Sequence, residues 1–302
     1  MDVQLTLTGL IGFFWGGFMT PIAIRLARDY QIMDHPDPRK IHKDLTPRGA
    51  GLALWGGYLL WALYAVPDFD GLRYSATAAT LVFFCGYMDD MKSLSPFLRL
   101  AVHLYAAYLV VSPLPLPFFS RVLCFLWIAG TTSAYNLIDG VNGLCISIFI
   151  ASALALCFVG NVSFGAAGAS MALGVLCWNF PMAQTFLGDG GSTLLGFLFA
   201  AHFISAAAPV LAKVGPHELI LLLLAFGGVP VLDTLAAFSR RIINGKSPFY
   251  PDRGHLHHKL MELTRSPFWA VTCLFLLHVL FLAGGTAVYT RLEVLVKTGL
   301  RP

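Results

Sequence analysis

Charged residues are scarce in this 302-residue sequence: they make up 12% of it, whereas a soluble domain carries about 25%. Hydrophobic residues make up 57%, and they gather in repeated apolar runs of roughly 20 residues. This pattern excludes an ordinary soluble domain and predicts a membrane protein with several spans. The runs are continuous rather than alternating, so helices are expected instead of a barrel. The formal net charge of +4 is too small to suggest a nucleic-acid partner.

Cysteine motifs are also missing. The six cysteines all fall within apolar runs, and no CxxC pair occurs. Cysteine in such surroundings packs as a small apolar side chain, so no disulfide framework is expected. They are Cys85, Cys124, Cys145, Cys157, Cys177 and Cys273.

Ten apolar runs are predicted to span the membrane as helices, which makes the expected fold all-α. The runs are 5–24, 49–66, 74–88, 97–111, 120–135, 144–160, 164–180, 192–210, 217–238 and 268–290. No internal repeat or low-complexity segment is visible, so residues 1–302 are expected to form one domain. The first run is too long for a signal-peptide core and lacks a small-residue cleavage pattern, which predicts that it stays as the first span.

The distribution of Lys and Arg predicts which loops face the cytosol. Loops after odd-numbered runs hold 14 of the 20 basic residues, and positive residues stay on the cytosolic side. The predicted cytosolic loops are about 25–48, 89–96, 136–143, 181–191 and 239–267. Both termini are then expected on the extracytoplasmic side.

Four polar breaks follow odd-numbered runs, so all four are expected on the cytosolic face. They are Asp89-Asp90, NLIDGVNG at 136–143, GDGG at 188–191 and HLHH at 255–258. Charged residues beside a bilayer are costly and are functional-site candidates by default.

The carboxylates of these breaks favour a bound cation. Asp89, Asp90 and Asp139 are expected at helix C-termini, with Asp189 just beyond another helix, where the helix dipole disfavours negative charge. Oxygen ligands of this kind suit Mg²⁺, which takes its remaining ligands from water and substrate phosphates. A simpler interpretation is that the carboxylates are solvated, or that Asp90 caps the next helix. The glycines around them also suit tight turns.

The loop 239–267 combines basic residues with three histidines. His255 and His258 would share a helix face, whereas His257 would point elsewhere. Arg and His are donors that suit phosphate oxygens. A zinc site is an alternative, although zinc usually takes sulfur or nitrogen ligands and no cytosolic cysteine is available. The loop 25–48, with six basic residues, is either a topology signal or a lip over an anionic substrate.

Six motifs together resemble the polyprenyl-phosphate N-acetylhexosamine-1-phosphate transferases, a superfamily that includes the phospho-MurNAc-pentapeptide translocase. The motifs are DHPDPRKIHKDLTPRGAG at 34–51, GYMDDMKSLSP at 86–96, NLIDGVNGL at 136–144, FLGDGGSTLLG at 186–196, PVLDTLAAFSRR at 230–241 and SPFYPDRGHLHHKL at 247–260. Their order and spacing make the resemblance specific. It implies a bacterial inner-membrane enzyme with a cytosolic active site and a Mg²⁺ requirement, with Mn²⁺ as a substitute. Undecaprenyl phosphate would attack UDP-N-acetylhexosamine, giving undecaprenyl-diphospho-N-acetylhexosamine and UMP.

The resemblance assigns roles to residues of this chain. Asp189 looks like the main Mg²⁺ ligand, with Asn136 or Asp139 near the metal, and Asp89 and Asp90 match a pair that activates the lipid phosphate or supports the metal. These acids and the histidines of the phosphate and sugar-side loop are the expected catalytic residues: Asp89, Asp90, Asp139, Asp189, His255, His257 and His258. The expected substrate-binding positions are Asn136, Gly140, Val141, Asn142 and Phe186, the last four for uridine, with Arg241 for the phosphates and sugar and Lys43 and Arg48 in the first loop. The role of Asp233 is less defined.

Departures from the family pattern are informative. Many relatives have Asp where this chain has Asn142, and His-Leu-His-His replaces the three successive histidines of the pentapeptide translocase. The simple aminosugar branch is therefore favoured over the pentapeptide branch, and a polytopic anion carrier is the alternative from another class. The sequence leaves open the sugar, the glycan pathway (O-antigen, common antigen or teichoic-acid type), a one-step or two-step mechanism, and the homodimer that relatives suggest.

Overall fold

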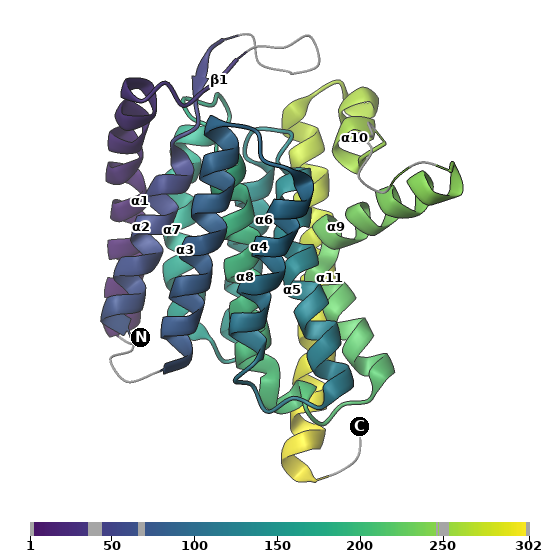
Figure 1. The fold of residues 1–302 in the computed structure, drawn as a ribbon. Helices are drawn as coiled ribbons and strands as arrows, with labels where there is room; N and C mark the ends of the chain where they lie inside the picture. The colour runs from purple at the N-terminus through teal and green to yellow at the C-terminus, as the bar shows by residue number, and fades with distance from the viewer. Residues whose placement is uncertain (1–2, 36–43, 66–69, 246, 248–253, 300–302) are drawn as a thin grey trace.

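The computed structural model describes residues 3–35, 44–65, 70–245, 247 and 254–299, and their fold is a bundle of helices (Figure 1). Eleven helices occur in this part of the chain, with one pair of two-residue antiparallel strands. The elements are α1 (Val3–Asp29), β1 (Met33–Asp34), β2 (Thr46–Pro47), α2 (Ala50–Ala65), α3 (Asp70–Met91), α4 (Pro96–Val111), α5 (Phe118–Ile138), α6 (Leu144–Phe158), α7 (Val162–Asn179), α8 (Gly188–Leu211), α9 (Pro216–Ile243), α10 (Leu256–Thr264) and α11 (Pro267–Thr298).

Each of the ten predicted apolar runs corresponds to one of the long helices. Within the described ranges, α1, α7, α8, α9 and α11 are long and apolar enough to cross a membrane, while α2, α4 and α6 are shorter apolar helices. The expectation of an all-helical, multi-pass membrane protein is therefore confirmed. The number of ten spans and the side on which the termini lie stay predictions.

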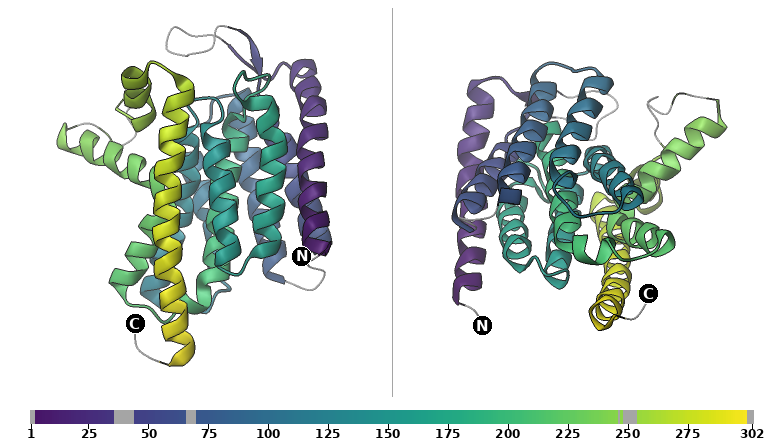
Figure 2. Two further views of the ribbon diagram at one scale, coloured as in Figure 1. Left: turned by 180° about the vertical axis from the view of Figure 1, so that it is seen from behind. Right: turned by 60° about the horizontal axis from the view of Figure 1, so that its bottom comes forward.

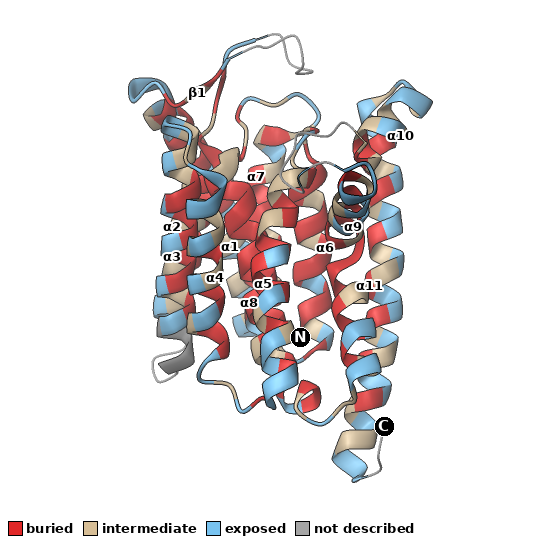
Figure 3. Ribbon diagram, turned by 45° about the vertical axis from the view of Figure 1, so that its right-hand side comes forward, coloured by how far each residue is buried: buried red, intermediate tan, exposed pale blue. Residues whose placement is uncertain are grey.

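Helix α8 forms the centre of the bundle. It packs against α2, α3, α4, α5 and α6, and most of its residues are buried (Figure 3). Other helices expose large apolar side chains such as Phe14, Phe18, Leu280 and Val294, as expected for surfaces that face lipid. The first turn of α8 lies beside the ends of α3 and α5, because Asp189 is hydrogen-bonded to Asp90 and Asn136.

The loops that hold the four polar breaks gather at one end of the bundle. The strand pair and α10 lie at this end, while both chain termini lie toward the other end (Figures 1 and 2). The strand pair was not predicted from the sequence, and α10 begins one residue later than the helix on which the three histidines were placed. Helix α9 is broken at Gly228, and its second half leaves the bundle at an angle (Figure 1).

Helices α3 and α8 approach closely at glycine positions beside the polar breaks. A Cβ added at Gly86 would lie 2.5 Å from the carbonyl oxygen of Asp189 and 2.7 Å from the Cα of Gly190. Both atoms belong to the backbone, so a neighbouring side chain cannot move away to make room. Gly86 is therefore a packing requirement of the α3–α8 contact.

We expect Gly86→Ala to lower the melting temperature, because overpacking of this kind costs about 1–3 kcal/mol. The matched control is Gly17→Ala, since no described atom lies within 4 Å of a Cβ built at Gly17. Thermal unfolding of the two variants in the same detergent measures the difference. Equal melting temperatures for both variants would contradict the tight α3–α8 contact.

Candidate active site

Asp90 holds the start of α8 in place. Its two carboxylate oxygens accept hydrogen bonds from the backbone N–H groups of Asp189 (2.9 Å) and Gly190 (3.1 Å). A carboxylate at a helix N-terminus satisfies unpaired N–H groups and is stabilised by the helix dipole. The Asp90 side chain is only 1% exposed, and Arg48 pairs with it at 2.8 Å. Asp90 is thus a cap, as the simpler interpretation suggested, but of α8 rather than of the next helix.

The first loop reaches the site through the strand pair. Arg48 follows β2 directly and forms ion pairs with both Asp34 of β1 and Asp90. The loop before α8 is joined to β2 by the Phe186 N–H, which donates to the Pro47 carbonyl at 2.9 Å. These contacts place part of the first loop beside the carboxylates. Lys43, the other substrate-binding candidate in this loop, lies outside the described residues.

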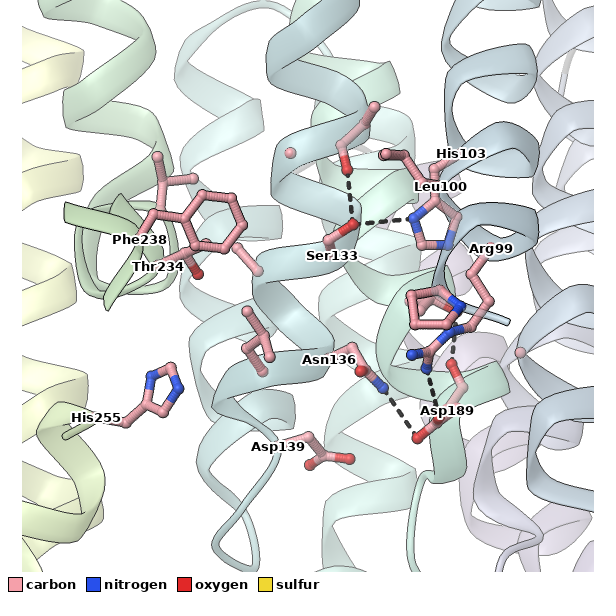
Figure 4. Close-up of a pocket in the computed structure, with 18 of the residues that line it drawn as sticks. Arg99, Leu100, His103, Ser133, Asn136, Asp139, Asp189, Thr234, Phe238 and His255 are labelled. Atoms are coloured by element: carbon pink, nitrogen blue, oxygen red, sulfur yellow. Dashed lines mark hydrogen bonds and ion pairs between the residues drawn. The ribbon is translucent and has the colours of Figure 1, made fainter. Parts of the chain in front are cut away.

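Arg99 links Asp89 and Asp189. It forms an ion pair with Asp89 at 2.6 Å and another with Asp189 at 3.3 Å, the second of which is drawn in Figure 4. Asp89 also accepts a hydrogen bond from the Leu94 N–H at 2.5 Å, which holds the turn between α3 and α4. The sequence interpretation counted Arg99 only as a cytosolic basic residue. Its place within an apolar run was a signal of function, because a charge there needs a partner.

The placement of Asp189 corrects one prediction. The residue lies in the first turn of α8 rather than just beyond the end of another helix. Its backbone therefore sits where the helix dipole favours a carboxylate, and the electrostatic case for a cation rests instead on the crowding of acidic groups. Asp89 and Asp90, at the end of α3, and Asp139, directly after α5, lie as predicted.

Asn136 and Asp139 project from the end of α5 toward Asp189. The Asn136 amide donates to the Asp189 carboxylate at 3.0 Å and to the Ser192 hydroxyl at 3.1 Å. Among the described residues, no Lys or Arg forms an ion pair with Asp139. Burial, together with the charges of Asp189 and Asp90, raises the pKa of the Asp139 carboxyl well above its ordinary value. Among the acidic groups of the site, Asp139 is thus the one whose negative charge is least balanced by positive side chains.

His255 is held by Asp233. Its carboxylate contacts the His255 ring at Nδ1 (2.8 Å) and accepts from the Leu256 N–H (3.1 Å), so it caps α10 as well. His257 lies against Gly140, where a Cβ would come within 2.6 Å of the ring nitrogen Nε2. Burial, followed by the charges of His258 and His255, lowers the pKa of His257 to about 4, so its ring is neutral at pH 7.

His257 also corrects a prediction. It was expected to point away from His255 and His258, because a helix was assumed to run through all three residues. The helix α10 begins only at Leu256, so His255 lies in extended backbone before it, and all three rings line one cavity. Arg241 lines the same cavity and lies over the ring of Phe238, 5.8 Å from its centroid.

Two cavities meet at the acidic groups. The first, of about 620 Å³, runs along α4, α5 and α9 and is lined largely by apolar residues such as Leu100, Ala129, Val231 and Phe238. Figure 4 shows its walls, with His255 and Phe238 opposite Arg99, and with Asn136 and Asp139 between them. The second, of about 460 Å³, has a more polar lining, with Asp34, Arg48 and Asn142 beside Gly140, Val141 and Phe186. The residues common to both are Asn136, Asp139, Gly140, Asp189 and His258.

The second cavity brings together all four residues that the resemblance assigned to uridine. They come from the loop after α5 and the loop before α8, which are distant in the sequence. No group of three or more His, Cys, Asp or Glu side chains among the described residues is arranged as a metal site. The oxygen-bearing side chains at the junction of the cavities include Asp189, Asp139 and Asn136, the three residues expected to hold Mg²⁺, and that role stays a prediction.

Comparison with known proteins agrees with this arrangement. The family model of glycosyl transferase family 4 matches residues 72–207, which span α3 to α8 and most of the site. The chain is 30% identical to a probable undecaprenyl-phosphate N-acetylglucosaminyl 1-phosphate transferase of Bacillus subtilis, over 87% of this chain and 79% of the relative. It is also 30% identical to the decaprenyl-phosphate N-acetylglucosaminephosphotransferase of Mycolicibacterium smegmatis, over 90% and 79% of the two chains.

A third relative is more distant. The undecaprenyl-phosphate alpha-N-acetylglucosaminyl 1-phosphate transferase of Escherichia coli is 27% identical, over 87% of this chain and 78% of its own length. These matches extend along nearly the whole chain, as the six sequence motifs do. The protein therefore belongs to glycosyl transferase family 4, the polyprenyl-phosphate N-acetylhexosamine-1-phosphate transferases.

Proposed function

We propose that the protein transfers N-acetylhexosamine-1-phosphate from a UDP-N-acetylhexosamine to undecaprenyl phosphate at the cytosolic face of a bacterial inner membrane. The observation that carries this proposal is the pair of cavities that meet at Asp189, Asp139 and Asn136. An apolar cavity between bundle helices suits the lipid, and a polar cavity between loops suits the nucleotide. The product would initiate a cell-surface glycan.

The reaction needs positioning and charge neutralisation more than a strong base, because a lipid phosphate is already ionised at neutral pH. Arg99 and Arg241 line the apolar cavity and would meet this phosphate. Arg48 and His258 line the polar cavity and would meet the diphosphate of the donor. In the one-step route, a phosphate oxygen of the lipid bonds to the β-phosphorus of the donor, and the bond to the α-phosphate oxygen breaks to release UMP.

This geometry suggests different roles for Asp89 and Asp90. Asp90 is fully engaged with the start of α8 and with Arg48, so its proposed role is to hold Asp189 and Arg48 in place. Asp89 shares Arg99 with Asp189 and is therefore the better candidate to orient that arginine toward the lipid phosphate. His255 is held by Asp233 in the apolar cavity, so in this proposal it would lie beside the lipid rather than the nucleotide.

A magnesium ion fits the donor set at the junction. Asp189 with Asp139 or Asn136 would hold it, since these groups offer hard oxygen ligands and Asp139 has no ion-pair partner among the described residues. When bound, the ion would neutralise charge on the diphosphate. Arg99 would keep Asp189 oriented for this contact.

UMP release by the purified protein tests the proposed function. With undecaprenyl phosphate and Mg²⁺ present, we expect UDP-N-acetylglucosamine to give the fastest UMP release among UDP-N-acetylhexosamine donors, because the relatives are named for that sugar. Mass spectrometry of the lipid fraction should show the diphospho-sugar product. UMP release that does not need the lipid would identify a hydrolase instead, and activity only with UDP-MurNAc-pentapeptide would place the protein in the other branch.

A further inference from the structure

The break in α9 is a built feature of the bundle. Gly228 has φ +48° and ψ −140° in the middle of the helix, a conformation that side chains other than glycine rarely adopt. Pro230 follows two residues later and offers no backbone N–H to continue the helix. Beyond the break, the second half of α9 turns away from the bundle (Figures 1 and 2).

A buried histidine from α11 satisfies the backbone at this break. The Val229 N–H donates to Nδ1 of His278 at 3.3 Å, and Nε2 of the same ring lies 2.8 Å from the Ser152 hydroxyl. A backbone N–H can only donate, so Nδ1 is the acceptor and the ring proton sits on Nε2, pointing at Ser152. The Tyr135 hydroxyl extends the chain, 2.9 Å from Ser152. His278 is therefore neutral and uses both ring nitrogens.

The environment makes this bond costly to lose. His278, Ser152 and Tyr135 are fully buried, and an unpaired N–H in apolar surroundings finds no water to replace the partner. On the other side of the break, the Trp127 indole donates to the Leu223 carbonyl at 2.8 Å. A Cβ at Gly228 would lie 2.4 Å from Nδ1 of His278, so the glycine also leaves room for the ring.

The second half of α9 forms a wall of the candidate active site. Val231, Thr234, Leu235, Phe238 and Arg241 line the apolar cavity, and Asp233 on the same segment holds His255 and the start of α10. None of the described residues that line the polar cavity belongs to α9. The direction in which this segment leaves the bundle therefore shapes the apolar cavity directly, and it reaches the polar cavity only through His258 of α10.

We propose that His278 is a positioning residue for the lipid substrate: its neutral ring holds the break in α9 open and so fixes the wall of the apolar cavity. The expected effect on lipid binding rests on the proposed transferase function. The role of His278 in fixing the break in α9 does not depend on that function. His278 itself touches neither cavity among their described lining residues, so its effect must pass through the break.

The kinetic test is His278→Leu, which keeps an apolar side chain of similar bulk and removes the acceptor. We expect the KM for undecaprenyl phosphate to rise about tenfold, because the free energy of one buried hydrogen bond corresponds to about this factor. The KM for the UDP-sugar should change less than about threefold. His278→Gln should restore the lipid KM to within about twofold, because the Gln amide can accept from Val229 and donate to Ser152. An equal rise in both KM values, or no rescue by Gln, would overturn the proposal.

Hydrogen–deuterium exchange over residues 229–243 gives a second measurement that does not depend on activity. Exchange should be faster in His278→Leu and near wild type in His278→Gln. The matched control is His202→Leu. His202 lies on α8, away from the break, and is also a buried histidine with two polar partners, Tyr58 and Asn161. It should leave exchange in this segment unchanged.

The two measurements separate the failure of this inference from that of the proposed function. A wild-type protein without transferase activity would refute the function, while the exchange data would still decide the role of His278. If His278→Leu does not fold, Ser152→Ala tests the same chain more mildly, with faster exchange over 229–243 expected. Wild-type exchange in that variant would overturn the proposal.

Discussion

Asp189→Asn should reduce UMP release by about 100- to 1,000-fold, the range seen when one preorganised electrostatic group is removed from an active site. The substitution keeps the shape of the side chain and an oxygen that can accept from Asn136. It removes the charge that pairs with Arg99 and the ligand expected to hold Mg²⁺. A steady-state assay with saturating donor and lipid measures the loss in kcat.

The backbone position of Asp189 makes this variant interpretable. Its N–H is held by Asp90 whatever the side chain at this position, so the start of α8 should persist and the melting temperature should change little. Titration with Mg²⁺ after treatment with a chelator provides the control. Wild-type protein should regain activity with Mg²⁺, whereas the variant should not. Full activity in Asp189→Asn would remove this residue from the proposed site.

The helical part of the fold was predictable because a bilayer leaves the backbone few options. Continuous apolar runs must form helices in lipid, so each run became one helix. The strand pair, the residue at which α10 begins and the α9 break were not predictable. Each depends on contacts from distant segments: Phe186 with Pro47, Asp233 with Leu256, and His278 with Val229.

The acidic residues of the site were predictable from the sequence, but their individual roles were not. Charged residues next to apolar runs are informative because they are costly, and this reasoning found Asp89, Asp90, Asp139 and Asp189. It could not distinguish an acid that caps a helix from an acid that faces a cavity. Arg99 was missed for a related reason: a basic residue near a span end also serves as a topology signal, and only its ion pairs show its place in the site.

Asp90→Asn is the variant that tests this distinction between neighbouring acids. Asn has one acceptor oxygen where Asp90 uses two for the start of α8, and it cannot pair as an anion with Arg48. Arg48 would keep Asp34 as a partner, so the main cost is a buried N–H of α8 left without its acceptor, about 1–3 kcal/mol. We therefore expect a lower melting temperature, by about 2 °C or more, together with a loss of activity of about 100-fold.

Asp89→Asn is the matched comparison. Arg99 would keep Asp189 as a partner after this change, and Asp89 holds no helix N-terminus, so the melting temperature should fall by less than half as much. Activity should still fall, because Arg99 would lose the contact that orients it. The two variants thus separate a structural carboxylate from one that acts at the site. If the melting temperature drops equally in both variants, or more in Asp89→Asn, Asp90 does not anchor α8. The proposal that Asp90 holds Asp189 in place would then have to be abandoned.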